Sequence, residues 1–310
     1  MFLPILLSSL AANAQEEATP TVEQAGSDIP RHRVYYESLA ALRYNPLGLQ
    51  ERMTIGYRMR LTDMPQDHLF FGDSYAWVGV TGLQTPAFMR VGPWARLMPI
   101  SLLRLQAGYE IVRYNGGLDQ MLTWDDSSNV NYSDDNIEAL AADGTLKAQG
   151  SIFTLEARIQ AKAGPVAVRA TLARYDYSYD VDGFAFYDQT LDILAPTNGV
   201  VKMGDFDLLY VATDQLTVGA RSSHTRSDAE FAANDSEATR AASIDRTGAL
   251  VAYKFKSDQG SRFDQPTVYV ISQWHINHEY RAGTEVNRAV PYLAIGFAFT
   301  GDAIAWTPQN

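Results

Sequence analysis

The sequence predicts an all-β fold: a transmembrane antiparallel up-and-down β-barrel of about 12 strands, with short turns at one end and long loops at the other. Three observations lead to this prediction. Segments of about 10 to 12 residues alternate between apolar and polar side chains, which is the period of a strand with one apolar face. The connections between these segments alternate between short and long. After the first residues, no stretch approaches the roughly 18 apolar residues that a membrane helix needs, so strands would have to cross the membrane.

The first 33 residues are predicted to lie outside the barrel. Residues 2–7 are apolar and precede Ala12-Asn13-Ala14, whose small-x-small form is typical of a signal-peptide cleavage site. We therefore expect a signal peptide over residues 1–14, a flexible polar leader over 15–33 and an outer-membrane barrel over 34–310. No Lys or Arg follows Met1. The alternative is a buried N-terminal segment of a cytosolic protein.

The strands are predicted from the alternation. In residues 53–61, apolar residues occupy the odd positions and polar or small residues the even ones, and residues 103–111 and 153–161 repeat this pattern. A β-sandwich also alternates, but its strands are usually about 5 or 6 residues long, whereas a tilted membrane strand needs about 10. Strands are expected near residues 34–44, 50–61, 73–83, 87–97, 102–114, 151–163, 166–177, 200–211, 216–226, 246–256, 266–277 and 290–300. Residues 34–44 also have helical propensity, and we predict a strand there because the strand number should be even.

The connections predict which end of the barrel faces which compartment. They are expected to be short at residues 98–101, 163–165 and 212–215, and long at residues 115–150, 178–199 and 227–245. Short periplasmic turns and long extracellular loops are typical of outer-membrane barrels, and an even strand number places both termini in the periplasm. The first third fits less well, because residues 44–49 form a short outer loop and residues 62–72 a rather long inner turn.

The last predicted strand carries a family resemblance. Residues 291–299, Pro-Tyr-Leu-Ala-Ile-Gly-Phe-Ala-Phe, resemble the aromatic-ended closing strand of bacterial outer-membrane β-barrel proteins. The resemblance is architectural, covers nearly the whole mature chain and indicates no subfamily. It implies a porin-like barrel in the outer membrane of a Gram-negative bacterium, with outer-membrane lipids, lipopolysaccharide and the barrel-assembly machinery as partners. Residues 301–310 depart from the pattern, because the aromatic segment does not end the chain.

Composition excludes several classes of function. The absence of cysteine excludes disulfide scaffolds, thiol catalysis and cysteine metal sites. The formal net charge of -11 argues against a nucleic-acid partner, because phosphate binding needs a basic surface. The 17 Tyr residues suit rings that lie between apolar and wet surroundings. We expect no cofactor.

Charged residues on the faces opposite the apolar ones are predicted to line the interior of the barrel. They are Arg58, Arg60, Arg90, Arg96, Arg104, Glu110, Glu156, Arg158, Arg169 and Arg221. Because rings of charge set the ion preference of a pore, this net basic interior predicts a passive channel for small, anionic solutes. The alternative is a closed structural or surface-interaction barrel, in which arginines and carboxylates pair across strands and fill the interior.

The long connections are predicted to carry negative charge, in contrast to the net basic interior. Residues 115–150 are rich in Asp and Glu, and residues 125–131 contain oxygen ligands that suit calcium without the spacing of a calcium-binding loop. A solvated acidic loop, or one bridged through cations to lipopolysaccharide, is the favoured interpretation. Tyr175, Tyr177 and Tyr179, with the aromatic residues at 184–187, are interpreted as interfacial anchors, with a sugar-stacking platform as the alternative.

Enzyme motifs are weak, and the sequence predicts that the chain is not an enzyme. His275, Asn277 and His278 form the densest polar cluster, and His275 and Asn277 are expected to share one face of a strand. Outer-membrane lipases place His, Ser and Asn on barrel strands, but no serine is evident beside these residues. A lipid hydrolase is therefore the third hypothesis, after the channel and the closed barrel.

Overall fold

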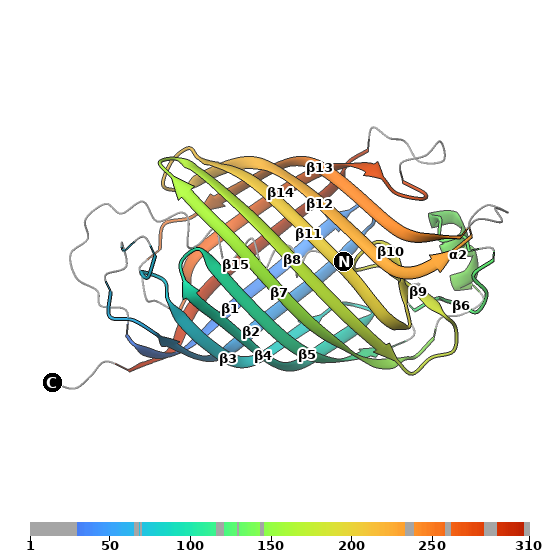
Figure 1. The fold of residues 1–310 in the computed structure, drawn as a ribbon, viewed down its shortest axis with the longest axis horizontal. Coiled ribbons are helices and arrows are strands. Elements are labelled where there is room, and N and C mark those ends of the chain that lie inside the picture. The colour runs from blue at the N-terminus through green and yellow to red at the C-terminus, as the bar shows by residue number, and fades with distance from the viewer. Residues whose placement is uncertain are drawn as a thin grey trace.

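The computed structural model describes residues 30–64, 68, 70–115, 121–128, 130–142, 146–232, 239–257, 262–281 and 290–306. Twelve antiparallel strands close into one barrel (Figure 1). They are β1 (His32–Tyr44), β2 (Gly48–Arg60), β3 (Tyr75–Gln84), β4 (Phe88–Ile100), β5 (Leu103–Tyr114), β7 (Gln149–Ala163), β8 (Val166–Tyr179), β11 (Asn198–Val211), β12 (Leu216–Phe231), β13 (Arg240–Lys254), β14 (Asp264–Asn277) and β15 (Tyr292–Trp306). The predicted signal peptide and most of the predicted leader lie outside the described residues.

Each barrel strand pairs with its neighbours in sequence, and β1 closes the barrel against β15. This order is that of an up-and-down barrel, so the predicted fold class is confirmed, and the chain has the architecture of an outer-membrane β-barrel protein. Residues 34–44 lie in β1, so the strand prediction there is correct. No helix in the described part of the chain is long and apolar enough to span a membrane.

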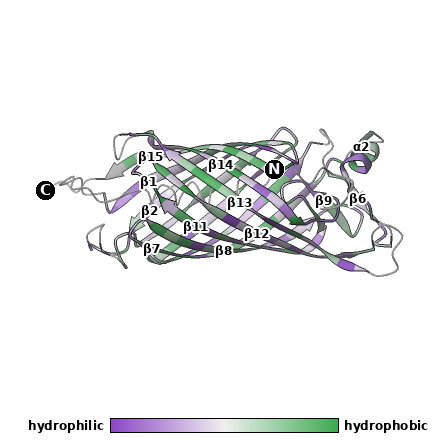
Figure 2. Ribbon diagram, turned by 90° about the horizontal axis from the view of Figure 1, so that it is seen from above, coloured by the Kyte–Doolittle hydropathy of each residue, from purple (hydrophilic) through white to green (hydrophobic). Residues whose placement is uncertain are grey.

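The wall of the barrel has one apolar and one mixed face, as alternation requires. Figure 2 shows hydrophobic and hydrophilic residues interspersed along the strands. The outward side chains of the central wall are large, apolar and exposed, among them Ile55, Val80, Ile159, Leu172 and Phe206. Their neighbours along each strand point inward and are buried or partly buried. A wall with this outer surface suits lipid and would be unusual in water, because exposed apolar patches of this extent are rare on soluble monomers.

A pair of glycines allows β2 and β3 to approach each other closely in the wall of the barrel. Gly56 of β2 lies opposite Gly79 of β3. A Cβ atom on Gly56 would lie 2.2 Å from the carbonyl oxygen of Val78, and one on Gly79 would lie 2.1 Å from that of Ile55. Only glycine fits at these two positions, because any side chain would force the two strands apart.

The connections at one end of the barrel fold into a small structure of their own. It consists of β6 (Thr123–Trp124), α2 (Asp134–Ala142), β9 (Ala185–Asp188) and β10 (Ile193–Pro196), and β6, β9 and β10 form a three-stranded sheet. We call these elements, the connection between β9 and β10 and residues 278–281 the cap, and their end of the barrel the long-loop end. Figure 1 shows α2, β6 and β9 gathered there, opposite the short turns. The described parts of the predicted long connections at 115–150 and 178–199 therefore contain folded elements.

The strand boundaries at β12 and β13 differ from the prediction. Barrel strands reach 16 residues, and much of the predicted loop 227–245 belongs to β12 and β13. In this stretch charged residues replace the apolar outward ones, while small or apolar side chains still point inward, as in Asp228, Ala229, Glu230 and Phe231. The strands therefore continue past the apolar belt, where their outer face becomes polar.

Candidate functional site

The ten charged residues predicted for the interior all lie on the inward face of the wall. Eight of them are buried to 5% exposure or less: Arg90, Arg96, Arg104, Glu110, Glu156, Arg158, Arg169 and Arg221. The other two lie toward the short-turn end and are half-buried. Arg58 places its guanidinium 3.6 Å from the ring centroid of Tyr75, and Arg60 donates from Nη2 to the carbonyl oxygen of Met64 at 2.7 Å.

One group of these residues is brought together by β5, β7 and β2. Arg104 Nη2 lies 2.7 Å from Glu156 Oε1, and Arg158 Nη2 lies 3.4 Å from the same oxygen. Arg52, across the interior, approaches Glu110 at 3.3 Å. Register explains the first cluster, because Arg104 lies opposite Arg158 on adjacent strands, and Glu156 lies two residues along from Arg158 on the same face.

A second group joins β8, β11 and β12. Asp207 accepts hydrogen bonds from Arg169 Nε at 2.8 Å and from Arg221 Nε at 2.6 Å, and Asp205 lies 3.7 Å from Arg221 Nη1. Asp207 lies opposite both arginines in the register of the sheet. All these side chains are at most 1% exposed.

Two further predicted residues tie the interior to other parts of the molecule. Arg96 forms a two-pronged contact with Glu37 of β1, at 2.9 and 3.2 Å, and lies within 5 Å of the ring centroids of Trp77 and Trp94. Arg90 donates to Thr190 Oγ1 of the cap at 3.1 Å. Each of the eight buried predicted residues therefore has a charged partner on the inner wall or, for Arg90, the hydroxyl of Thr190.

Several further charged residues on the inward face were not predicted. They are Glu37, Arg43, Arg52, Asp205, Asp207 and Arg246. A stricter use of alternation would have found two of them, because Asp205 and Asp207 alternate with Phe206 and Leu208. Their partners were not predictable, because pairing depends on register between strands.

The cap closes the long-loop end of the barrel with an apolar core. Phe186, Ile193, Leu194 and Ala195 of β9 and β10 are fully buried. They pack in one cluster with inward residues from the strand ends, including Val112, Ile152, Val201, Ile244 and the three tyrosines of β8. Tyr175, Tyr177 and Tyr179 are each 5% exposed or less. Their interpretation as interfacial anchors is therefore wrong, because alternation turns them inward and exposes Arg174, Asp176 and Ser178 instead.

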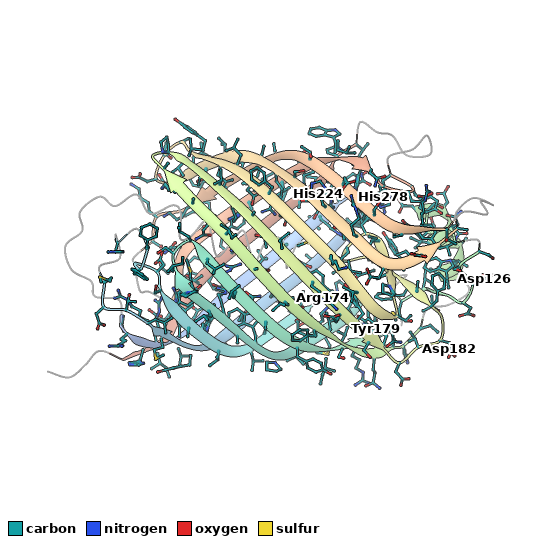
Figure 3. The ribbon with its side chains drawn as sticks, viewed as in Figure 1. Asp126, Arg174, Tyr179, Asp182, His224 and His278 are labelled. Carbon is teal, nitrogen blue, oxygen red and sulfur yellow. The ribbon has the colours of Figure 1, made fainter. Side chains whose placement is uncertain are left out.

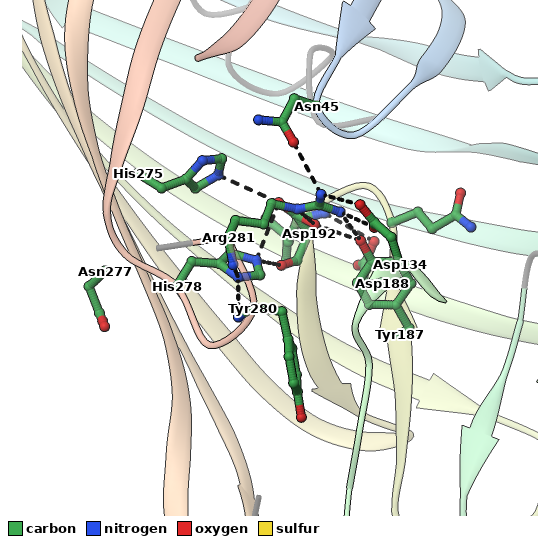
Figure 4. A network of polar contacts seen from close by, with 12 residues as sticks. Asn45, Asp134, Tyr187, Asp188, Asp192, His275, Asn277, His278, Tyr280 and Arg281 are labelled. Carbon is green, nitrogen blue, oxygen red and sulfur yellow. Dashed lines mark hydrogen bonds and ion pairs between the residues drawn. The ribbon is translucent and has the colours of Figure 1, made fainter. Parts of the chain in front are cut away.

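A polar network fastens the cap to the barrel around Asp192 and Arg281 (Figure 4). Arg281 Nε donates to both oxygens of Asp192 at 2.9 and 3.0 Å, and its two Nη atoms donate to Asp134 at 2.7 and 2.8 Å. Nη1 also donates to Asn45 Oδ1 at 3.1 Å. Arg281 thus links residues 278–281 to the start of α2, to the connection between β9 and β10 and to the turn between β1 and β2.

Further groups converge on Asp192. Tyr187 donates its hydroxyl to Asp192 Oδ1 at 2.6 Å, and His278 Nε2 lies 3.0 Å from the Asp192 carbonyl oxygen. His275 Nε2 approaches the carboxylate at 3.6 Å. Burial by itself raises the pKa of the Asp192 carboxyl, but Arg281 and His278 outweigh it and hold this pKa well below its usual range. Asp192 also raises the pKa of Arg281, against the effect of burial.

The predicted pair of His275 and Asn277 is separated by the structure. His275 points inward to Asp192, whereas Asn277 Nδ2 donates to Ser243 Oγ at 2.8 Å on the other side of the wall. The prediction that they share a face is wrong, because a β-bulge shifts the register between Asp245–Asn277 and Arg246–His275. His278 belongs to the cap network, and in the part of the chain that the structure describes neither His275 nor His278 forms a hydrogen bond with a serine.

The acidic segment at 125–131 forms a local turn. Asp126 accepts hydrogen bonds from the backbone N–H and the hydroxyl of Ser128, at 2.8 and 2.7 Å. Asn129 lies outside the described residues. Among the residues that are described, no three His, Cys, Asp or Glu side chains come close enough together to hold a metal ion. Asp134, at the start of α2, binds Arg281.

Comparisons with known proteins concern the fold. No family model and no curated protein matches the sequence. Among solved structures, the chain is similar to Acinetobacter baumannii OccAB1, with 12% identity, a TM-score of 0.40 and coverage of 83% of this chain; it spans 58% of that protein's length. It is also similar to the NanC porin, with 6% identity and a TM-score of 0.40 over 86% of this chain and 98% of NanC. The translocator domain of NalP from Neisseria meningitidis gives 10% identity and a TM-score of 0.36 over 96% and 95% of the two chains.

Proposed function

We propose that this protein is a bacterial outer-membrane barrel with a closed interior, which presents its cap at the cell surface and is not an open diffusion pore. This proposal rests on the burial of the charged side chains at mid-barrel. Arg158, Arg169 and Asp207 are each at most 1% exposed although they face the interior of a closed barrel. An open aqueous channel would leave such side chains in contact with water.

The cap supports the same proposal at the long-loop end. Its β9 and β10 residues fill this mouth with apolar side chains, and the Arg281 network holds them there. Ions do not cross a filled apolar plug, because leaving water for such surroundings costs several kcal/mol per charge. Two successive barriers, an apolar one in the mouth and an ion-paired one below it, separate the ends of the barrel.

The outer wall and the cap indicate what the protein contacts. The apolar belt fits the acyl chains of outer-membrane lipids, with the polar strand ends beyond it at the level of the headgroups. Acidic residues such as Asp126, Asp134 and Glu138 lie on the exposed side of the cap or at its edge. Divalent cations would connect such carboxylates to lipopolysaccharide phosphates. Insertion by the barrel-assembly machinery follows from the same membrane location.

Planar-bilayer recording tests the closed interior. We expect the purified, refolded protein to give no stepwise conductance at moderate voltage. The double variant Arg158→Ala, Arg169→Ala combined with removal of residues 185–196 should produce a conductance. It removes the apolar side chains that fill the mouth and two of the arginines that fill the interior below it. Heat-dependent migration on a denaturing gel verifies that each sample is a folded barrel. Regular conductance steps from the unaltered protein would refute the closed interior.

A gated passage for small anionic solutes is the second candidate, and one observation favours it. Buried arginines outnumber buried carboxylates among the described residues, and Arg169 Nη1 and Nη2 have no hydrogen-bond partner there although both are buried. Spare guanidinium donors attract anions. If steps occur, replacing Arg58, Arg60 and Arg104 with Gln should reduce anion preference, measured as the reversal potential in a salt gradient. An unchanged reversal potential would count against passage along these residues.

A further inference from the structure

The outer face of β12 changes character along its length. Toward the short-turn end its outward residues are Val218 and Ala220, and toward the long-loop end they are Arg226, Asp228 and Glu230. Ser222 and His224 lie at the transition. At the level of Ser222, Phe206 on the adjacent β11 is 52% exposed, and Trp274 on β14, beyond β13, is 44% exposed. A change from apolar to charged residues, with an indole at the same level, marks the boundary between acyl chains and headgroups.

At this boundary three side chains are arranged in a chain of hydrogen bonds. Ser222 Oγ lies 3.3 Å from His224 Nε2, and His224 Nδ1 lies 2.7 Å from Asp245 Oδ1. Ser222 and His224 share the outer face because they are two residues apart on β12, and Asp245 lies directly opposite His224 on β13. Figure 3 labels His224 on the barrel wall.

The two nitrogens of the His224 imidazole have different partners, and this arrangement suits a general base. A carboxylate at Nδ1 fixes the tautomer that carries its proton there, which leaves Nε2 free to take the proton of a hydroxyl. Asp245 is itself held by Arg226 Nη2 at 2.9 Å. Thr247 Oγ1 lies 3.1 Å from Ser222 Oγ and can donate to negative charge that develops beside it.

We propose that Ser222, His224 and Asp245 form a serine-hydrolase site for ester-linked acyl lipids, reached from the membrane at the outer wall of the barrel. The His224 side chain is 56% exposed, so the ester group of a lipid can approach it from the membrane. Phe206 and Ile276, on the strands to either side, offer exposed apolar surface for acyl chains. The site rests on the proposed membrane location and is independent of whether the interior of the barrel is closed.

The reaction follows from the positions of the three groups. Ser222 Oγ attacks the ester carbonyl carbon while its proton passes to His224 Nε2, and the bond from that carbon to the alcohol oxygen then breaks as the alcohol takes this proton. Water attacks the resulting acyl-serine and gives a proton to His224 Nε2. The bond to Ser222 Oγ breaks, the carboxylic acid leaves and the proton returns to Ser222. Asp245 positions the imidazole and stabilises its charged form.

The competing explanation is a polar collar that merely hydrates the wall at headgroup level. Both explanations place polar residues at this height, but only a catalytic site requires Ser222 to be more nucleophilic than other serines. Ser223 is a matched control, because it is the next residue on β12, faces the interior and contacts Gln273 at 3.0 Å. A fluorophosphonate probe, which reacts with activated serines, distinguishes the two explanations.

The experiment uses the full-length folded protein in mixed micelles of detergent and diacyl phosphatidylethanolamine. We expect fatty-acid release and covalent labelling of Ser222 by the fluorophosphonate. Both should fall to background in Ser222→Ala and His224→Ala and persist in Ser223→Ala. Asp245→Asn should lower kcat by about 10⁴-fold with little change in KM, because it removes the group that orients the imidazole.

Two results would overturn the proposal. One is a folded, heat-modifiable protein that releases no fatty acid and is not labelled at Ser222, which would leave the polar collar as the explanation. The other is lipid turnover that survives Ser222→Ala. Flotation of the protein with liposomes tests the membrane location separately, so a failure of the site and a failure of the proposed location give different results.

Discussion

Replacing Arg281 with Met provides a strong test of how the cap is held. Met keeps much of the side-chain volume but removes all the donors to Asp192, Asp134 and Asn45. Asp192 is then left as a buried carboxylate, 1% exposed, without its main counter-charge. Removing one partner of a buried ion pair typically costs about 3 to 5 kcal/mol, because the other charge stays desolvated.

This cost should appear as local opening of the cap and not as loss of the barrel, because the barrel strands are held by continuous backbone pairing. The cost of about 3 to 5 kcal/mol corresponds to an opening equilibrium about 150 to 5,000 times larger. Hydrogen exchange of backbone amides measures this equilibrium directly. We expect faster exchange at Ile193, Leu194 and the residues of α2, with unchanged exchange in the centre of β11 and β12.

Arg174→Met is the matched control. Arg174 contacts Asp176 at 2.6 Å, but this pair lies on the outer wall and is largely exposed (Figure 3). Its removal should leave exchange in the cap unchanged, because exposed pairs contribute little. Adding Asp192→Asn to Arg281→Met should recover part of the lost protection, since no uncompensated charge then remains buried. Equal exchange in Arg281→Met and in the unaltered protein would refute the proposed role of Arg281.

Three further predictions concern pH, packing and the interior charges. The lowered pKa of Asp192 stabilises the cap above its unfolded-state pKa of about 4, so amide protection of the cap should persist as pH falls to 4 and disappear only below it. Gly56→Ala should abolish the heat-modifiable barrel, whereas Gly82→Ala, with 3.9 Å to the nearest atom, should be tolerated. Glu156→Gln should lower the free energy of unfolding by about 3 to 5 kcal/mol in urea titrations, because Arg104 and Arg158 lose their shared carboxylate. An unchanged urea midpoint would contradict this role for Glu156.

The fold was predictable because its main signal is local. A strand of a membrane barrel must alternate, and the alternation of residues 53–61 or 153–161 is visible without knowing which strand lies beside it. The same signal assigned Arg104, Arg158 and Glu156 to the inner face. It fails where a bulge changes the face of a residue, as at Asn277, and where inward aromatic residues such as Tyr177 look like interfacial anchors.

The sites were less predictable because they depend on contacts between distant residues. Arg281 and Asp134 are 147 positions apart, and Arg281 and Asn45 are 236 apart. No periodicity connects such residues, and only the folded cap brings them together. Ser222, His224 and Asp245 are closer together in the sequence, but their arrangement also depends on a contact that the sequence does not reveal. Asp245 lies opposite His224 only because the hairpin of β12 and β13 has one particular register.

Register also makes the proposals for the two faces of the wall separately testable. Arg221 and Ser223 point into the barrel, whereas Ser222, between them, points outward. A change at Ser222 should therefore alter lipid chemistry without changing the interior ion pairs. A change at Arg221 should disturb its pairing with Asp207 and leave the distance between Ser222 and His224 intact. If substitutions at these adjacent positions gave the same phenotype, the effect would have to come from loss of the barrel, and neither site could be inferred from it.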